Sequence, residues 1–230
     1  MKLLASITLM SLILSCKSTG PASTKDTGTG ISYLALGDSY TIGESVDVKD
    51  RYPNQLMEAL KNAGVSKGST EIVAKTGWTT DELTAGIAAA GIGSKKYDLV
   101  SLLIGVNNEF RGRSPEQYKT AFEELLKQAV NFADGKKNRV FVVSIPDYGY
   151  TPYGKSNQPA ISARIDQFNE AAKAITASMD IVFFDITPIS RKGLSEPELV
   201  AGDGLHPSGA MYAEWIALMR DDVAKMLMRD

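Results

Sequence analysis

Short apolar runs alternate with stretches of helical periodicity along most of this 230-residue chain. Such runs, when they are bounded by turn residues, are typical of buried parallel strands, and they occupy residues 31–36, 71–74, 99–104, 140–145 and 181–186. Apolar residues at helical spacing follow or separate them, most clearly at residues 115–129, 161–179 and 212–227. Because parallel strands need crossover helices, the alternation predicts an α/β fold, a three-layer α/β/α sandwich on a five-stranded parallel sheet.

The N-terminus has the pattern of an export signal. Lys2 precedes about a dozen mostly apolar residues, too few for a bilayer span of roughly 20 residues, which predicts a signal peptide over residues 1–15. The segment "ILSC", which ends at Cys16, resembles the lipobox of bacterial lipoproteins, in which the signal is cut before the Cys and that Cys is diacylated. Cys16 is the only cysteine, so it forms no internal disulfide. The alternative is a conventional signal peptide with an incidental Cys.

Residues 16–30 are rich in Ser, Thr, Gly and Pro, which is typical of a flexible linker after the acylated Cys. We therefore expect one folded domain over residues 31–230, held to a membrane through the lipid anchor on the periplasmic or cell-surface side. The net charge of −2 and the scattered Lys and Arg residues argue against a nucleic-acid partner. One His and one acylated Cys leave only carboxylates as metal ligands, so we expect neither a metal nor another cofactor.

Polar, Gly-rich segments stand at the predicted strand ends. They read "GDSY", "TGWTTDE", "GVNNEFRG" and "IPDYGYTP", and a fifth, "AGDGLHPSG", precedes the last helix. In a parallel sheet the carboxyl ends of the strands meet at one edge, where ligands bind. The sequence therefore predicts a functional site at this edge.

The single histidine, His206, narrows the chemistry of that site. Asp203 precedes it by three residues across a Gly-containing turn, near enough for a carboxylate to accept from one imidazole nitrogen and leave the other as a base. Ser39 at the tip of the first strand is then a candidate nucleophile. A surface histidine beside ordinary turn residues is the alternative.

Four blocks together resemble the signature blocks of the GDSL or SGNH hydrolases. "GDSY", Gly77, "GVNN" and "DGLHP" follow in the family's order, and the resemblance covers nearly all of residues 31–230. It implies a flavodoxin-like sheet and a carboxylic ester hydrolase that works through an acyl-enzyme. It also implies that Ser39 is the nucleophile, with Asp203 and His206 as the other triad members. The oxyanion hole is then formed by Ser39, Gly77 and Asn107.

One position departs from the family pattern. Asn108 stands where the family usually has Asp after the oxyanion Asn, and that Asp supports the loop, so the change puts loop rigidity in question. Taken without the resemblance, the pair Asn107-Asn108 is typical of a turn, and Gly77 of a positive-φ position after a strand.

The resemblance leaves the substrate open, because the family includes lipases, lysophospholipases, thioesterases and carbohydrate acetylesterases. Short loops favour a small acyl group, so we expect a small-acyl or O-acetyl ester, with an acylated carbohydrate or a lysolipid as the partner molecule. Tyr148, Tyr150 and Tyr153 are candidates for a wall facing the sugar or alcohol, or are plain loop residues. The alternatives are a lysophospholipase or thioesterase, and a non-catalytic ligand-binding lipoprotein. The sequence does not define the oligomeric state.

The lipobox interpretation makes a direct prediction. Cys16→Ser should move the protein from the membrane fraction to the soluble fraction and leave its purified activity unchanged, because two acyl chains anchor a protein where one is marginal. Intact-mass measurement of the mature wild-type chain checks this. A mature chain that starts at Cys16 without lipid, or several residues later, would contradict the anchor.

Overall fold

The computed structural model describes residues 30–228. The predicted signal peptide (1–15), the predicted lipidation site Cys16 and all but the last residue of the predicted linker lie outside the described residues. The lipoprotein form therefore stays a prediction.

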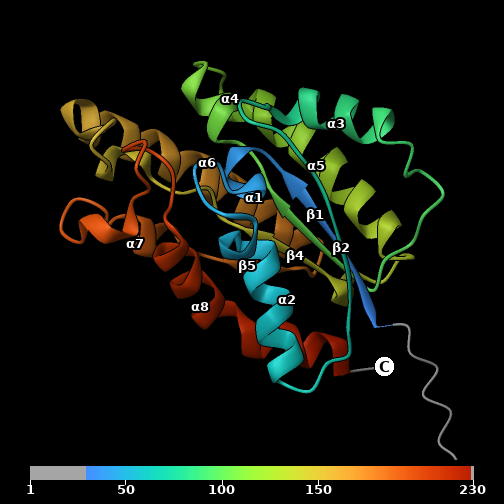
Figure 1. The fold of residues 1–230 in the computed structure, drawn as a ribbon. Helices are drawn as coiled ribbons and strands as arrows, with labels where there is room; N and C mark the ends of the chain where they lie inside the picture. The colour runs from blue at the N-terminus through green and yellow to red at the C-terminus, as the bar shows by residue number, and fades with distance from the viewer. Residues whose placement is uncertain (1–29, 229–230) are drawn as a thin grey trace, which may run out of the picture.

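Within residues 30–228, five strands form one parallel sheet in the order β2-β1-β3-β4-β5 (Figure 1). The strands are β1 (Ile31–Gly37), β2 (Lys67–Ala74), β3 (Leu99–Leu103), β4 (Val140–Val143) and β5 (Val182–Phe184). This is the flavodoxin-like order, in which the chain reverses its direction of travel across the sheet between β1 and β3. The predicted parallel α/β sandwich is confirmed.

The two edge strands depart most from the predicted boundaries. β2 begins four residues before the expected position 71, because backbone pairing with β1 extends through polar residues that no apolar run marks. β5 has three residues where six were expected, since only Val182–Phe184 pair with β4 and no strand lies beyond them in the described sheet.

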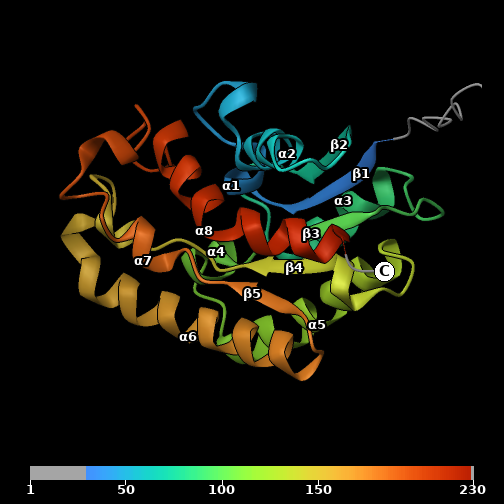
Figure 2. The ribbon, with the colours of Figure 1, turned by 90° about the horizontal axis from the view of Figure 1, so that it is seen from below.

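Helices cover both faces of the sheet. Figures 1 and 2 show α3, α4, α5 and α6 on one side and α2, α7 and α8 on the other. Their bounds are α2 (Tyr52–Asn62), α3 (Thr80–Ala89), α4 (Val106–Phe110), α5 (Pro115–Phe132), α6 (Gln158–Ser178), α7 (Thr187–Ser190) and α8 (Gly209–Met228). Short 3₁₀ turns connect them at η1 (Val48–Asp50), η2 (Lys137–Arg139), η3 (Tyr148–Tyr150), η4 (Lys155–Asn157) and η5 (Pro197–Leu199).

Helix α2 was not predicted from the sequence. Pro53 occupies its first turn, and Leu56, Met57 and Leu60 are buried on one face, so the signal was present but short. α2 packs against α8, where Tyr52 lies near the ring of Trp215. The two helices together cover one face of the sheet (Figure 2).

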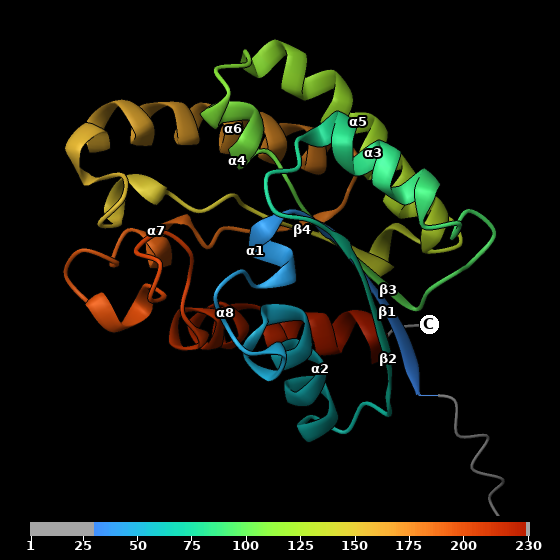
Figure 3. The same cartoon turned by 45° about the horizontal axis from the view of Figure 1, so that its top comes forward.

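The short helix α1 (Ser39–Ile42) lies between the two helical layers (Figure 3). It follows β1 directly, and α4 follows β3, the neighbour of β1 in the sheet. From the opposite layer, the Tyr212 hydroxyl of α8 donates to the carbonyl of Tyr40 at 3.0 Å. The chain thus brings α1 and α4 together at the point where the strand order reverses.

Candidate active site

The backbone at the end of β1 leaves no room for a side chain at Gly37. A Cβ at Gly37 would lie 2.0 Å from the Thr41 Oγ1 and 2.4 Å from the Leu103 carbonyl oxygen. Asp38 then caps α1, because its Oδ1 accepts from the Tyr40 N–H at 3.0 Å. Ser39 therefore begins α1 at the carboxyl edge of the sheet.

A chain of hydrogen bonds joins Ser39, His206 and Asp203. The His206 Nε2 lies 3.0 Å from the Ser39 Oγ, and the His206 Nδ1 lies 2.6 Å from the Asp203 Oδ2. Since an ionised carboxylate only accepts, Nδ1 carries the proton and Nε2 is left to accept from the hydroxyl. The geometry allows His206 to take the Ser39 proton during attack on an electrophile.

Asp203 is held ionised by its neighbours. Partial burial acts to raise the pKa of its carboxyl, but hydrogen bonds from the His206 side chain, the His206 and Leu205 N–H groups and the Ser45 hydroxyl outweigh it. The pKa of Asp203 is therefore well below its usual range. The charge needed to orient and stabilise a protonated imidazole is present at neutral pH.

The two remaining predicted site residues come from separate segments of the chain. Asn107 lies in the first turn of α4 and lines the same pocket as Ser39 and His206, and its Nδ2 donates to the Trp78 carbonyl at 3.0 Å. Gly77 lies in the loop between β2 and α3 with φ +85°, where glycine is favoured. Gly77 is not among the described residues that line the pocket, and it connects to Asn107 through its neighbour Trp78.

Asn108 fastens α4 to the start of α3. Its side chain is buried, its Oδ1 accepts from the Thr80 N–H at 3.1 Å, and its Nδ2 donates to the Thr80 Oγ1 at 2.8 Å. An Asp at this position could accept from the same N–H but could not donate while ionised. The change from Asp to Asn at position 108 therefore does not remove the support of the loop, because the Asn108 amide holds it to Thr80. The turn expected from the Asn107-Asn108 pair alone is instead a short helix.

A pocket of about 130 Å³ opens over Ser39 and His206. Its walls are mostly apolar and include Tyr40, Val106, Phe110, Tyr148, Tyr153 and Leu205. Three of the lining aromatic rings lie next to one another, with centroids 6.0 Å apart for Phe110 and Tyr148 and 6.4 Å for Phe110 and Tyr153. Phe110 and Tyr153 are about half exposed.

Two of the three candidate wall tyrosines line this pocket. Tyr148 and Tyr153 line the pocket, whereas Tyr150 is not among the described residues that do. Sequence reasoning missed Phe110, whose only signal is its helical spacing of three residues from Asn107. It also missed Leu205, which lies beside His206.

Glu109, a buried carboxylate on α4, holds Tyr148 in the pocket wall through a hydrogen bond. The Tyr148 hydroxyl donates to the Glu109 Oε2 at 2.9 Å, and the Glu109 Oε1 pairs with the Arg164 Nε at 2.5 Å. The Glu109 side chain is fully buried, so these two partners are what stabilise its charge there. They fix α4 and Tyr148 to helix α6.

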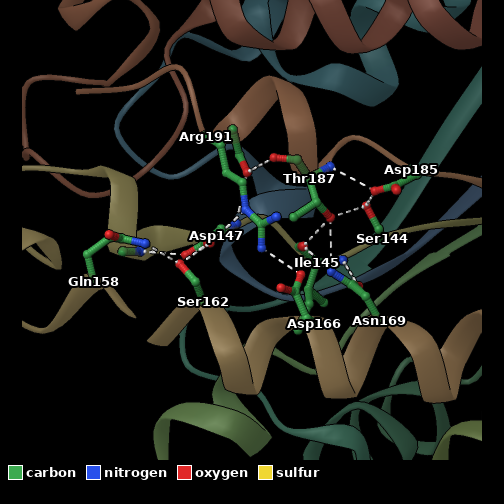
Figure 4. Close-up of polar contacts among 12 residues, drawn as sticks. Ser144, Ile145, Asp147, Gln158, Ser162, Asp166, Asn169, Asp185, Thr187 and Arg191 are labelled. Carbon is green, nitrogen blue, oxygen red and sulfur yellow. Dashed lines mark hydrogen bonds and ion pairs between the residues drawn. The ribbon is translucent and has the colours of Figure 1, made fainter. Parts of the chain in front are cut away.

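A second network, shown in Figure 4, holds the segment that precedes Tyr148. Buried Asp147 accepts from the Arg191 Nε at 2.9 Å and from the Ser162 Oγ at 2.6 Å, and Arg191 also reaches Asp166 at 2.6 Å. The network links α6 to the loop after α7 across the end of β4. The pocket wall is thus held by charges as well as by apolar packing.

Asp38 is fully buried beside the nucleophile. Burial raises the pKa of its carboxyl to about 7, although the N–H groups of Tyr40 and of Asp38 itself and the Asn107 amide act in the opposite direction. Its Oδ2 lies 3.4 Å from the Asn107 Nδ2. Asp38 therefore binds a proton in the folded chain at a pH where an unfolded chain has lost it.

The part of the chain that the structure describes shows neither a group of side chains suited to a metal ion nor a helix suited to span a membrane. Between residues 30 and 228 no group of three or more His, Cys, Asp or Glu side chains is placed to hold a metal ion. None of the helices in that range is both long and apolar enough to cross a bilayer.

A family model and several solved structures match this chain. A family model described as GDSL-like Lipase/Acylhydrolase family matches residues 35–214. None of the curated proteins matches the chain. The chain is similar to the crystal structure of TesA, with TM-score 0.65 and 18% identity, covering 85% of this chain and 99% of that one.

Two further solved structures are similar at the level of the fold. The psychrotrophic esterase EstA from Pseudoalteromonas sp. has TM-score 0.64 and 16% identity, covering 86% of this chain and 99% of its own. Axe2, an acetylxylan esterase from Geobacillus stearothermophilus, has TM-score 0.63 and 20% identity, covering 88% of this chain and 96% of its own.

The buried Asp38 predicts a pH-dependent stability. The pKa of the Asp38 carboxyl is raised from 3.8 to about 7. Its contribution to the free energy of unfolding is therefore fully present below pH 3.8 and is lost as the pH rises through about 7. The slope is at most about 1.4 kcal/mol per pH unit. Relative to Asp38→Asn, which does not titrate, the wild type should lose about 2.6 kcal/mol of unfolding free energy between pH 5 and pH 8. Urea unfolding at both pH values measures this, and a difference independent of pH would contradict it.

Proposed function

This chain belongs to the GDSL-like lipase/acylhydrolase family and is a carboxylic ester hydrolase, and from that premise we propose that it cleaves small-acyl esters through an acyl-enzyme on Ser39. The observation that carries the proposal is the hydrogen-bond chain from Asp203 through His206 to Ser39 at the floor of the pocket.

In the proposed first step the Ser39 Oγ attacks the ester carbonyl carbon while His206 Nε2 takes the hydroxyl proton. The carbonyl oxygen becomes an oxyanion, for which the Ser39 N–H, the Gly77 N–H and the Asn107 Nδ2 are the proposed donors. The long 3.4 Å contact from Nδ2 to Asp38 leaves one amide hydrogen that can turn to the substrate. Loss of one such donor typically slows an enzyme by about 10²–10³-fold.

Release of the alcohol then completes the acylation, with His206 now acting as the acid. The tetrahedral intermediate collapses, the C–O bond to the alcohol breaks, and the imidazolium gives its proton to the departing oxygen. Water then attacks the carbonyl carbon of the acyl-enzyme while His206 Nε2 accepts its proton. The second tetrahedral intermediate collapses, the bond to the Ser39 Oγ breaks, the imidazolium returns the proton to that oxygen, and the carboxylic acid leaves. Ionised Asp203 stabilises the imidazolium at both stages.

The pocket supports a small acyl group. Its volume of about 130 Å³ is below the roughly 300 Å³ at which pockets for drug-sized ligands begin. The exposed rings of Phe110 and Tyr153 offer flat apolar faces at the mouth, suited to the ring of an O-acetylated carbohydrate. The fold of Axe2, an acetylxylan esterase, is consistent with this proposal.

Removal of the nucleophile tests the proposed reaction. Ser39→Ala should lower kcat for p-nitrophenyl acetate by at least about 10³-fold without lowering the melting temperature, because it deletes only the attacking oxygen. Ser178→Ala, which changes an exposed serine at the end of α6, is the matched control and should keep wild-type kcat. More than a few per cent activity in a stable Ser39→Ala variant would contradict the assignment. Absence of turnover in the wild type would favour a non-catalytic binding protein.

An acyl-chain series tests the proposed substrate. With p-nitrophenol as the common leaving group, kcat/KM should be highest for acetate and should fall at least about tenfold by octanoate, because longer chains overfill the pocket. Phe110→Ala should raise KM for an acetylated xylo-oligosaccharide more than KM for p-nitrophenyl acetate. Activity that instead rises with chain length would favour the lysophospholipase or thioesterase alternative.

A further inference from the structure

Helix α4 contacts two successive carbonyls of the loop that contains Gly77. Asn107 and Arg111 are four residues apart, so they lie on the same side of this helix and its C-cap. The Asn107 Nδ2 donates to the Trp78 carbonyl at 3.0 Å, and the Arg111 Nη2 donates to the Gly77 carbonyl at 2.7 Å. Arg111 therefore holds the peptide unit between Gly77 and Trp78, and Asn107 holds the next unit, between Trp78 and Thr79.

Arg111 is itself held in place. Its guanidinium reaches Glu82 in the first turn of α3 at 3.2 Å. The Glu82 carboxylate also accepts from the Thr79 N–H at 2.9 Å, as expected of a capping box. A planar guanidinium fixed by a carboxylate on one side keeps a defined direction for its charge-assisted bond on the other.

The orientation of this peptide matters because Gly77 adopts a positive φ of +85°. A glycine has no side chain to limit the rotation of its backbone, so its N–H keeps one direction only if the neighbouring peptide is held. Asn107 fixes the second carbonyl, and Arg111 supplies the contact to the carbonyl of Gly77 itself.

We propose that Arg111 is a positioning residue for the oxyanion hole: by binding the Gly77 carbonyl, it keeps the Gly77 N–H aimed at the developing oxyanion. This inference rests on the proposed function, since it takes Gly77 and Asn107 as oxyanion donors. Arg111 does not touch the reacting atoms, and it acts through the loop.

The chain contains a matched control for this role. Arg113, two residues later, pairs with Asp81 at 2.5 Å, so it also joins the segment after α4 to the first turn of α3. The side chains of Arg111 and Arg113 are 44% and 34% exposed, so they are similarly solvated. The contacts of Arg113 run to Asp81 and not to the Gly77 carbonyl.

The experiment compares Arg111→Met with Arg113→Met, because each loses one guanidinium and one ion pair with α3. Kinetics with p-nitrophenyl acetate should show kcat lowered about tenfold in Arg111→Met with KM within about twofold. The affinity for methylboronic acid, which forms a tetrahedral adduct, should fall by a similar factor. Arg113→Met should keep kcat within about twofold even where its melting temperature falls equally, and Arg111→Lys should recover part of the lost kcat.

Wild-type kcat in Arg111→Met, or equal losses of kcat in both variants, would overturn the inference. The Ser39→Ala variant distinguishes this failure from failure of the proposed function. If Ser39→Ala is inactive while Arg111→Met retains wild-type kcat, only the role of Arg111 is wrong. If Ser39→Ala remains active, the proposed function is wrong and the inference falls with it.

Discussion

Ser39 and His206 are 167 positions apart in the chain, yet a 3.0 Å hydrogen bond joins their side chains. The contact depends on α8, because His206 lies just before this helix and the Tyr212 hydroxyl of α8 donates to the Tyr40 carbonyl of α1. Asp203 then fixes the imidazole through a contact of 2.6 Å. The chemistry that we propose for this esterase depends on this bonded chain, and the neighbouring loops either hold it or shape the space above it.

Much of that support is electrostatic. Asp38, Glu109 and Asp147 are all buried next to the site, where an unpaired carboxylate is strongly unfavourable. They are accommodated in two ways, since Asp38 takes up a proton below about pH 7, whereas Glu109 pairs with Arg164 and Asp147 pairs with Arg191. The partly exposed arginines keep one side in water, so the ion pairs link the pocket wall to the outer helices. Breaking such a pair costs more than forming it contributes.

The architecture could be predicted from the sequence because it follows local rules. Apolar runs mark strands and the polar blocks stand at their ends, so Ser39 and His206 could be placed at one edge of the sheet. Asn107 was assigned only through the resemblance to the GDSL hydrolases, since the pair Asn107-Asn108 alone is typical of a turn. Edge strand β2 extended through polar residues, because backbone pairing needs no apolar side chain. Phe110 and Arg111 were missed because their roles depend on long-range contacts, to Tyr148 and to the Gly77 carbonyl, which no spacing reveals.

Covalent trapping tests the central claim most directly. An alkyl phosphonate with a p-nitrophenolate leaving group reacts with an activated serine to give a stable adduct that resembles the tetrahedral intermediate. Intact-mass measurement and peptide mapping of the treated wild type should find one phosphonyl group per chain, on Ser39, formed as p-nitrophenolate is released. Absence of an adduct, or an adduct on any other residue, would contradict the account.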